Sequence, residues 1–94
     1  MIVIDFETRS NVDIITQGGM RYHKDPSTDI LVLGYKVNTG PVQFWYPGMP
    51  FPKVLTMDTI YAFNIEFELG IWNNVGVKKY GWPELKIEQC IALS

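Results

Sequence analysis

Short apolar runs separated by turn residues fill the first half of the chain and predict strands. Residues 1–6 are rich in branched side chains and predict a buried strand with Asp5 near its C-terminal end. Residues 30–37 and 42–46 predict two more strands, and the Asn-Thr-Gly turn at 38–40 joins them. We therefore expect these two strands to form a hairpin.

The second half of the chain predicts one more strand and one main helix. Residues 47–52 hold three of the six prolines, so they predict a loop that carries the chain across an end of the sheet. Residues 59–63 predict a fourth strand. Residues 64–75 place apolar side chains at helical spacing, and Asn64 is a natural N-cap for that helix. The order of elements predicts an α/β fold, with a mixed sheet of about four strands layered on one main helix.

Three segments carry weaker signals. Residues 11–24 predict one helical turn after a cap at Ser10 or Asn11, followed by a loop around Gly18 and Gly19. Residues 76–83 predict a loop. Residues 84–94 are compatible with the start of a last strand or helix.

Length, charge and cysteine content narrow the class of protein. A chain of 94 residues predicts a single domain over residues 1–94, and 47% hydrophobic residues predict that it folds. The net charge of -2 argues against general binding to duplex DNA, which usually needs a basic face. One cysteine, Cys90, allows no internal disulfide, and no secretory leader or membrane segment is evident, so we expect a cytoplasmic protein.

Asp5 and Glu7 form the first candidate site. Residues two apart in a strand point to the same face, so the two carboxylates stand side by side. Like charges so close repel one another, and a hard divalent cation between them relieves the repulsion. The pair therefore indicates a magnesium or manganese site. The alternative is that both acids are simply solvated at the end of a strand.

Glu66 and Glu68 form the second candidate, in the first turns of the helix that follows Asn64. Carboxylates there can be ordinary helix-start residues, because the helix dipole favours negative charge at its N-terminus. His23, the single histidine, is expected at the surface, and Cys90 has no partners that indicate a nucleophile. No glycine-rich phosphate loop, zinc-ligand spacing or serine-histidine-aspartate order is evident.

Taken in order, the motifs resemble a known family. The segments IDFETRS, GGMRY, DPSTDIL, AFNIEFE followed by IW, and KYGWP are similar to the start of the 3′-to-5′ proofreading exonuclease domain of phage-type family A DNA polymerases. That domain belongs to the DEDD exonuclease superfamily and has a ribonuclease-H-like fold. The resemblance extends over nearly the whole chain and implies a phage or prophage protein in a bacterial cytoplasm. Within such a fold we expect strand 1–6 to be central, antiparallel to 30–37 and parallel to 59–63.

The resemblance also implies roles for single residues. Asp5 and Glu7 match the first exonuclease motif, and Glu68 falls where the second motif has its acid. These three residues would be the catalytic metal ligands for two Mg²⁺ or Mn²⁺ ions, with Asp5 bridging both. Thr8 and Asn64 would lie close to the terminal nucleotide. The implied substrate is the single-stranded 3′ end of DNA, and the implied partner is the remainder of a polymerase chain.

The sequence departs from the family in three places. Phe63 stands where the family usually has histidine, and Glu68 where the superfamily usually has aspartate. The third motif, a tyrosine or histidine followed four residues later by aspartate, is not found after Glu68. We therefore expect a fragment of an exonuclease domain that is inactive alone. The alternative is a non-catalytic remnant or interaction module that keeps the first half of the fold and is open to a homodimer through an exposed sheet edge.

Overall fold

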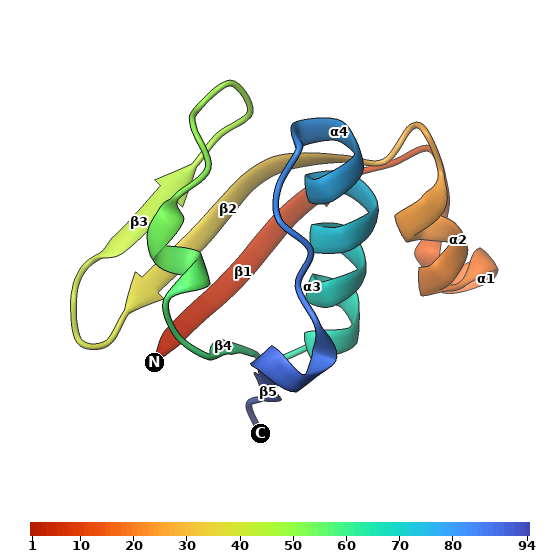
Figure 1. The fold of residues 1–94 in the computed structure, drawn as a ribbon. Helices are drawn as coiled ribbons and strands as arrows, with labels where there is room; N and C mark the ends of the chain where they lie inside the picture. Colours follow the sequence, from red (N-terminus) through yellow and green to blue (C-terminus); the bar gives the residue numbers. More distant parts are fainter.

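A mixed β-sheet with a helical layer on one face makes up the fold, as Figure 1 shows for the computed structural model of residues 1–94. The strands are β1 (Ile2–Arg9), β2 (Asp29–Val37), β3 (Val42–Trp45), β4 (Ile60–Ala62) and β5 (Cys90–Ala92). The α-helices are α1 (Ile14–Gln17), α2 (Gly19–Lys24), α3 (Ile65–Ile71) and α4 (Lys78–Tyr80). A π-helical turn, η2 (Trp72–Val77), and two 3-10 turns, η1 (Lys53–Thr56) and η3 (Ile87–Gln89), complete the elements.

The sheet has the order β3-β2-β1-β4-β5, with β1 in the centre. β1 pairs antiparallel with β2 and parallel with β4, as predicted for the first strand. The hairpin between β2 and β3 is confirmed as well. The sheet has five strands instead of about four, because the last segment adds β5 in parallel beside β4. The predicted α/β fold with a mixed sheet is confirmed.

Pairing along β1 is uneven, and this shapes the site described below. β2 pairs with β1 along its whole length, from Ile2 to Arg9, with one bulge where Leu31 has no partner. β4 pairs only with Ile2 and Val3. The second half of β1 therefore has a free edge on the side of β4.

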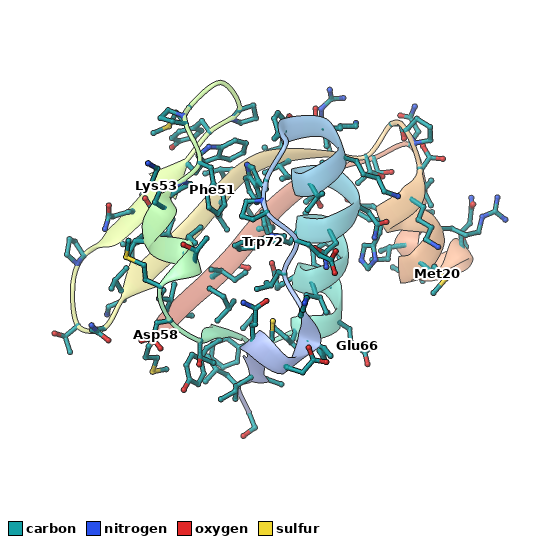
Figure 2. The ribbon with its side chains drawn as sticks, in the orientation of Figure 1. Met20, Phe51, Lys53, Asp58, Glu66 and Trp72 are labelled. Atoms are coloured by element: carbon teal, nitrogen blue, oxygen red, sulfur yellow. The ribbon has the colours of Figure 1, made fainter.

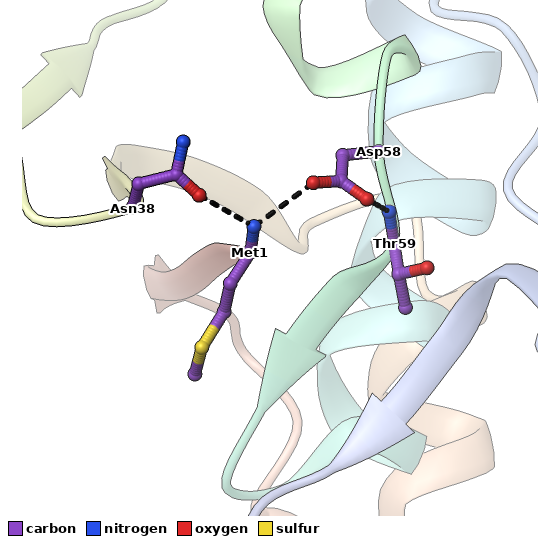
Figure 3. Close-up of polar contacts among 4 residues, drawn as sticks. All are labelled: Met1, Asn38, Asp58 and Thr59. Atoms are coloured by element: carbon purple, nitrogen blue, oxygen red, sulfur yellow. Dashed lines mark hydrogen bonds and ion pairs between the residues drawn. The ribbon is translucent and has the colours of Figure 1, made fainter.

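The opposite end of the sheet is tied by the amino group of Met1 (Figure 3). It donates hydrogen bonds to Asn38 Oδ1 at 2.7 Å and to Asp58 Oδ2 at 2.9 Å. Asp58 also accepts the amide of Thr59. These hydrogen bonds lower the pKa of Asp58, the one to the amino group most strongly. The contacts join the start of β1 to the β2–β3 turn and to the segment before β4.

The main helix is longer than the sequence predicts. Asn64 caps α3, as expected, by accepting the amide of Phe67. The helical path then continues through η2 and α4 to Tyr80, so the prediction of a loop from residue 76 is wrong. Gly76 permits this continuation, since a Cβ there would lie 2.3 Å from a ring carbon of Trp82. The turn falls at Gly81, which has a left-handed φ of 71°.

Two short helices replace the predicted turn and loop at 11–24. Asp13, and not Ser10 or Asn11, caps α1 by accepting the amide of Ile15. The loop expected around the glycine pair is the helix α2, which begins after Gly18 at a φ of 85°. Its Tyr22 is buried and packs on Phe67 of α3, with ring centroids 5.9 Å apart.

The core lies between the sheet and the α3–η2–α4 helix. Its centre is aromatic: the ring of Trp82 lies 4.9 Å from that of Trp45 and 5.3 Å from that of Trp72, in nearly perpendicular planes. Phe51 closes this cluster from the loop before η1, and Figure 2 shows it close to Trp72. Such edge-to-face contacts suit the ring quadrupoles and add to the burial of apolar area.

The two faces of the sheet differ in chemistry because side chains alternate along each strand. Ile2, Ile4 and Phe6 of β1 are buried under the helix, whereas Asp5 and Glu7 are exposed on the other face. That second face, which we call the open face, carries no covering element in the structure. No helix is long and apolar enough to cross a membrane.

Candidate functional site

The exposed acids of β1 occupy the centre of the open face. Asp5 and Glu7 point the same way, as their spacing predicts, and neither takes part in an ion pair or side-chain hydrogen bond. Their free carboxylates stand beside the part of β1 that has no strand partner toward β4. Two unpaired acids on one strand form a negatively charged surface that a cation would stabilise.

Glu68 approaches this pair from the helical layer. It shares the inward face of the helix with Ile71, Trp72 and Val75, and its side chain is only 5% exposed. The carboxylate oxygen Oε2 accepts the amide of Phe6 at 3.0 Å. That amide lies beyond the last β4 partner, so no strand carbonyl is available to it. Glu68 thus satisfies a buried backbone donor that the short β4 leaves unpaired.

Electrostatics link Glu68 to both acids of β1. The pKa of Glu68 is raised to about 7, chiefly by burial and to a smaller extent by the negative charges of Asp5 and Glu7. The hydrogen bond from Phe6 acts in the opposite direction, because it stabilises the carboxylate. Glu68 is therefore poised to exchange a proton near neutral pH. Glu66, two residues earlier, is exposed and points away from the sheet (Figure 2).

The three acids suit a hard cation in chemistry, since all their donors are carboxylate oxygens. They are not preassembled, however: no group of three or more histidine, cysteine, aspartate or glutamate side chains is arranged to hold a metal ion. Glu68 holds the Phe6 amide with one oxygen. A cation shared with Asp5 and Glu7 would thus have to draw on its second oxygen or displace that hydrogen bond.

The two predicted nucleotide contacts, Thr8 and Asn64, come from different elements. Thr8 follows Glu7 in β1, and its hydroxyl shares a hydrogen bond of 2.8 Å with the hydroxyl of Tyr22. Asn64 is exposed at the start of α3, where its Oδ1 is engaged as the cap. It also lines a cavity of about 600 Å³ between α2 and α3 that includes none of the three acids. Their roles toward a nucleotide stay predictions.

His23, expected at the surface, instead lies between α2 and α3. Its ring rests on Gly70, where a Cβ would lie 2.0 Å from Nδ1. Its Nε2 is buried without a hydrogen-bond partner, and burial lowers its pKa. The sequence holds one signal for this contact, which is the glycine at position 70 within the apolar helix pattern.

Comparison with known proteins adds no relative: no family model, no curated protein and no solved structure matches the chain. The fold and the site define a sheet with a group of three acids around its central strand. A mixed sheet has two free acids on its central strand, and a helix brings a third, buried acid to the same strand.

Proposed function

We propose that the chain carries the first part of a metal-dependent 3′-to-5′ exonuclease site of the DEDD type, on a ribonuclease-H-like sheet. The observation that supports this best is the placement of Glu68. Its carboxylate, 5% exposed, touches the backbone of β1 between Asp5 and Glu7 and carries a pKa of about 7. Perturbed carboxylates beside like charges are common at functional sites.

In this proposal the chain's own groups bind the cation and manage protons. Asp5, Glu7 and Glu68 would hold Mg²⁺ or Mn²⁺, and such an ion supplies hydroxide from bound water at neutral pH. Because the pKa of Glu68 is raised to about 7, the carboxyl would release its proton to solvent on binding a cation. The acids would act on the terminal phosphodiester of a single-stranded 3′ end, together with the remainder of a polymerase chain in a phage-infected bacterial cell.

Titration with manganese, followed by amide NMR and melting curves, tests this proposal. Manganese should broaden the signals of Asp5, Phe6 and Glu68 first and raise the melting temperature. Glu68→Gln should weaken both responses. The matched control is Glu66→Gln on the same helix, because Glu66 is exposed and points away from β1. If several millimolar manganese changes neither signal, or acts equally on both variants, the metal site is wrong.

A second candidate is a non-catalytic interaction module. The absence of a preassembled three-ligand group and the use of Glu68 as a partner for the Phe6 amide favour it. In that case Glu68 only accepts the Phe6 amide, a role that Glu68→Gln keeps through its acceptor oxygen. Manganese should then have no effect on the wild type or on Glu68→Gln.

A further inference from the structure

The open face carries more than acids. The strand registers place Asp5 beside Gly34 of β2, and Gly34 beside Phe44 of β3. Directly paired residues point to the same face of a sheet. Phe44, 51% exposed, Gly34 and Asp5 therefore form one row across the open face.

The ring of Phe44 leans over the glycine toward the acid. A Cβ built on Gly34 would lie 3.8 Å from Cε1 of Phe44 and 3.7 Å from the carbonyl oxygen of Asp5. Neighbouring strands are about 4.8 Å apart, so the ring covers the strand next to the acid. Tyr46, 52% exposed, places a second ring 6.4 Å from that of Phe44.

Gly34 is not demanded by the fold. Its φ lies outside the left-handed region, and a Cβ there would make only ordinary contacts. A glycine inside a central strand weakens the sheet and often marks the close approach of another group. Here the missing side chain lets the ring of Phe44 lie directly over β2, beside Asp5.

We propose that the exposed Phe44 ring stacks on a base of a single-stranded DNA segment whose backbone continues across the open face toward Asp5. This inference rests on the proposed nuclease site and names how its substrate is held. Aromatic rings on a sheet bind single strands with little sequence preference, because every base has a π-face. Lys36, exposed on the same face beside Val3, offers a positive charge to a phosphate.

The central acids argue against a second protein on this face. Interfaces between proteins deplete charged residues at their core, and two free carboxylates buried there would lose their hydration without a partner. A nucleic-acid strand that brings a divalent cation with it satisfies these same carboxylates. In that arrangement the rings of Phe44 and Tyr46 would contact bases of the DNA, and Lys36 would contact a phosphate.

NMR titration of the protein with a short oligothymidylate at low salt, with millimolar Mg²⁺ present, tests the stacking. We expect the amides of Gly34, Phe44 and Asp5 to shift. Phe44→Ala should weaken binding about tenfold, Phe44→Tyr should keep it, and Gly34→Val should weaken it by displacing the Phe44 ring. Val42→Ala, on the same strand and face, is the matched control and should change binding less than about twofold.

Three results would overturn the inference. The first is no shift at these amides, and the second is equal binding by Phe44→Ala and wild type. The third is a protein that does not bind the oligonucleotide but forms a dimer in sedimentation, when Phe44→Ala abolishes that dimer. The last would assign the face to a second copy of the chain. The manganese response of Phe44→Ala separates the two proposals. If it persists while oligothymidylate binding does not depend on Phe44, only the stacking is wrong; if manganese never acts, the nuclease site is wrong.

Discussion

Glu68 reaches across from the helix to accept the amide of Phe6 at 3.0 Å, in the middle of the strand that carries Asp5 and Glu7. This hydrogen bond links the helix to β1 and places the Glu68 carboxylate beside the backbone between the two exposed acids. Burial of the Glu68 carboxyl raises its pKa and so makes its protonation part of the stability of the fold.

Stability should therefore fall as the pH rises through about 7. The pKa of Glu68 rises from 4.5 to about 7 on folding, so its contribution is complete below about pH 4.5 and is lost as the buried carboxyl ionises. The loss is no more than about 3 kcal/mol, and solvent near the exposed acids reduces it. Urea unfolding from about pH 5 to about pH 9 measures it.

Glu68→Gln is the matching control for that experiment. The amide keeps an acceptor for Phe6 but cannot ionise, so the decrease in unfolding free energy between about pH 4.5 and about pH 7 should disappear. His23 acts in the opposite direction, because burial lowers its pKa. Its protonation destabilises the fold as the pH falls below the ordinary histidine pKa of 6.5. Because both proteins contain His23, their difference isolates Glu68. Equal pH profiles would show that Glu68 is not the titrating group.

Asp5→Asn should raise the melting temperature of the metal-free protein and abolish its response to manganese. The substitution removes one of the negative charges that act on Glu68, and it also removes a ligand. In the wild type, manganese at about 100 times its dissociation constant should add roughly 2.7 kcal/mol. Incomplete oxygen sites bind weakly, so we expect a dissociation constant in the high-micromolar to millimolar range. A lower melting temperature for metal-free Asp5→Asn would contradict the repulsion.

The chain by itself should show little or no exonuclease activity with manganese. Only three carboxylates are brought to β1, and removal of one member of a two-metal set costs orders of magnitude in rate. Degradation of a labelled single-stranded oligonucleotide measures this. Robust activity that Asp5→Ala abolishes would refute the prediction and show that these residues suffice.

Gly70→Ala should lower the free energy of unfolding by about 1 to 3 kcal/mol, although alanine favours helices. The new methyl group would occupy the space of the His23 ring. His23→Ala empties that space. Adding Gly70→Ala to the His23→Ala variant should therefore lower the free energy of unfolding much less than adding it to the wild type. A double-mutant cycle from urea unfolding gives the coupling. Additive effects would mean that the two residues do not share this volume.

The sequence predicts those elements of the fold whose signals are local. The alternation in β1, the turn at 38–40 and the cap at Asn64 depend on near neighbours, and all appear as expected. The sequence does not predict the helix beyond Val75, because Gly76 resembles a helix breaker until Trp82 is packed against it. Contacts between distant segments override local preference in such places.

The site divides along the same line. Asp5 and Glu7 can be predicted as a pair from the sequence, because they are two residues apart on one strand. That Glu68, and not Glu66, turns inward follows from its place among the buried residues of the helix. The need for Glu68 at the Phe6 amide arises from the shortness of β4, which depends on the whole sheet. The row of Phe44, Gly34 and Asp5 likewise requires the registers of three strands.

The tryptophan cluster has a consequence for optical work on this protein. All three tryptophans of the chain, at positions 45, 72 and 82, meet in the core beneath the sheet. Their near-perpendicular rings should couple electronically and give a strong near-ultraviolet dichroism that vanishes when the core opens. No indole lies on the open face, so tryptophan emission should follow unfolding closely while staying almost silent to a strand or cation bound beside Asp5.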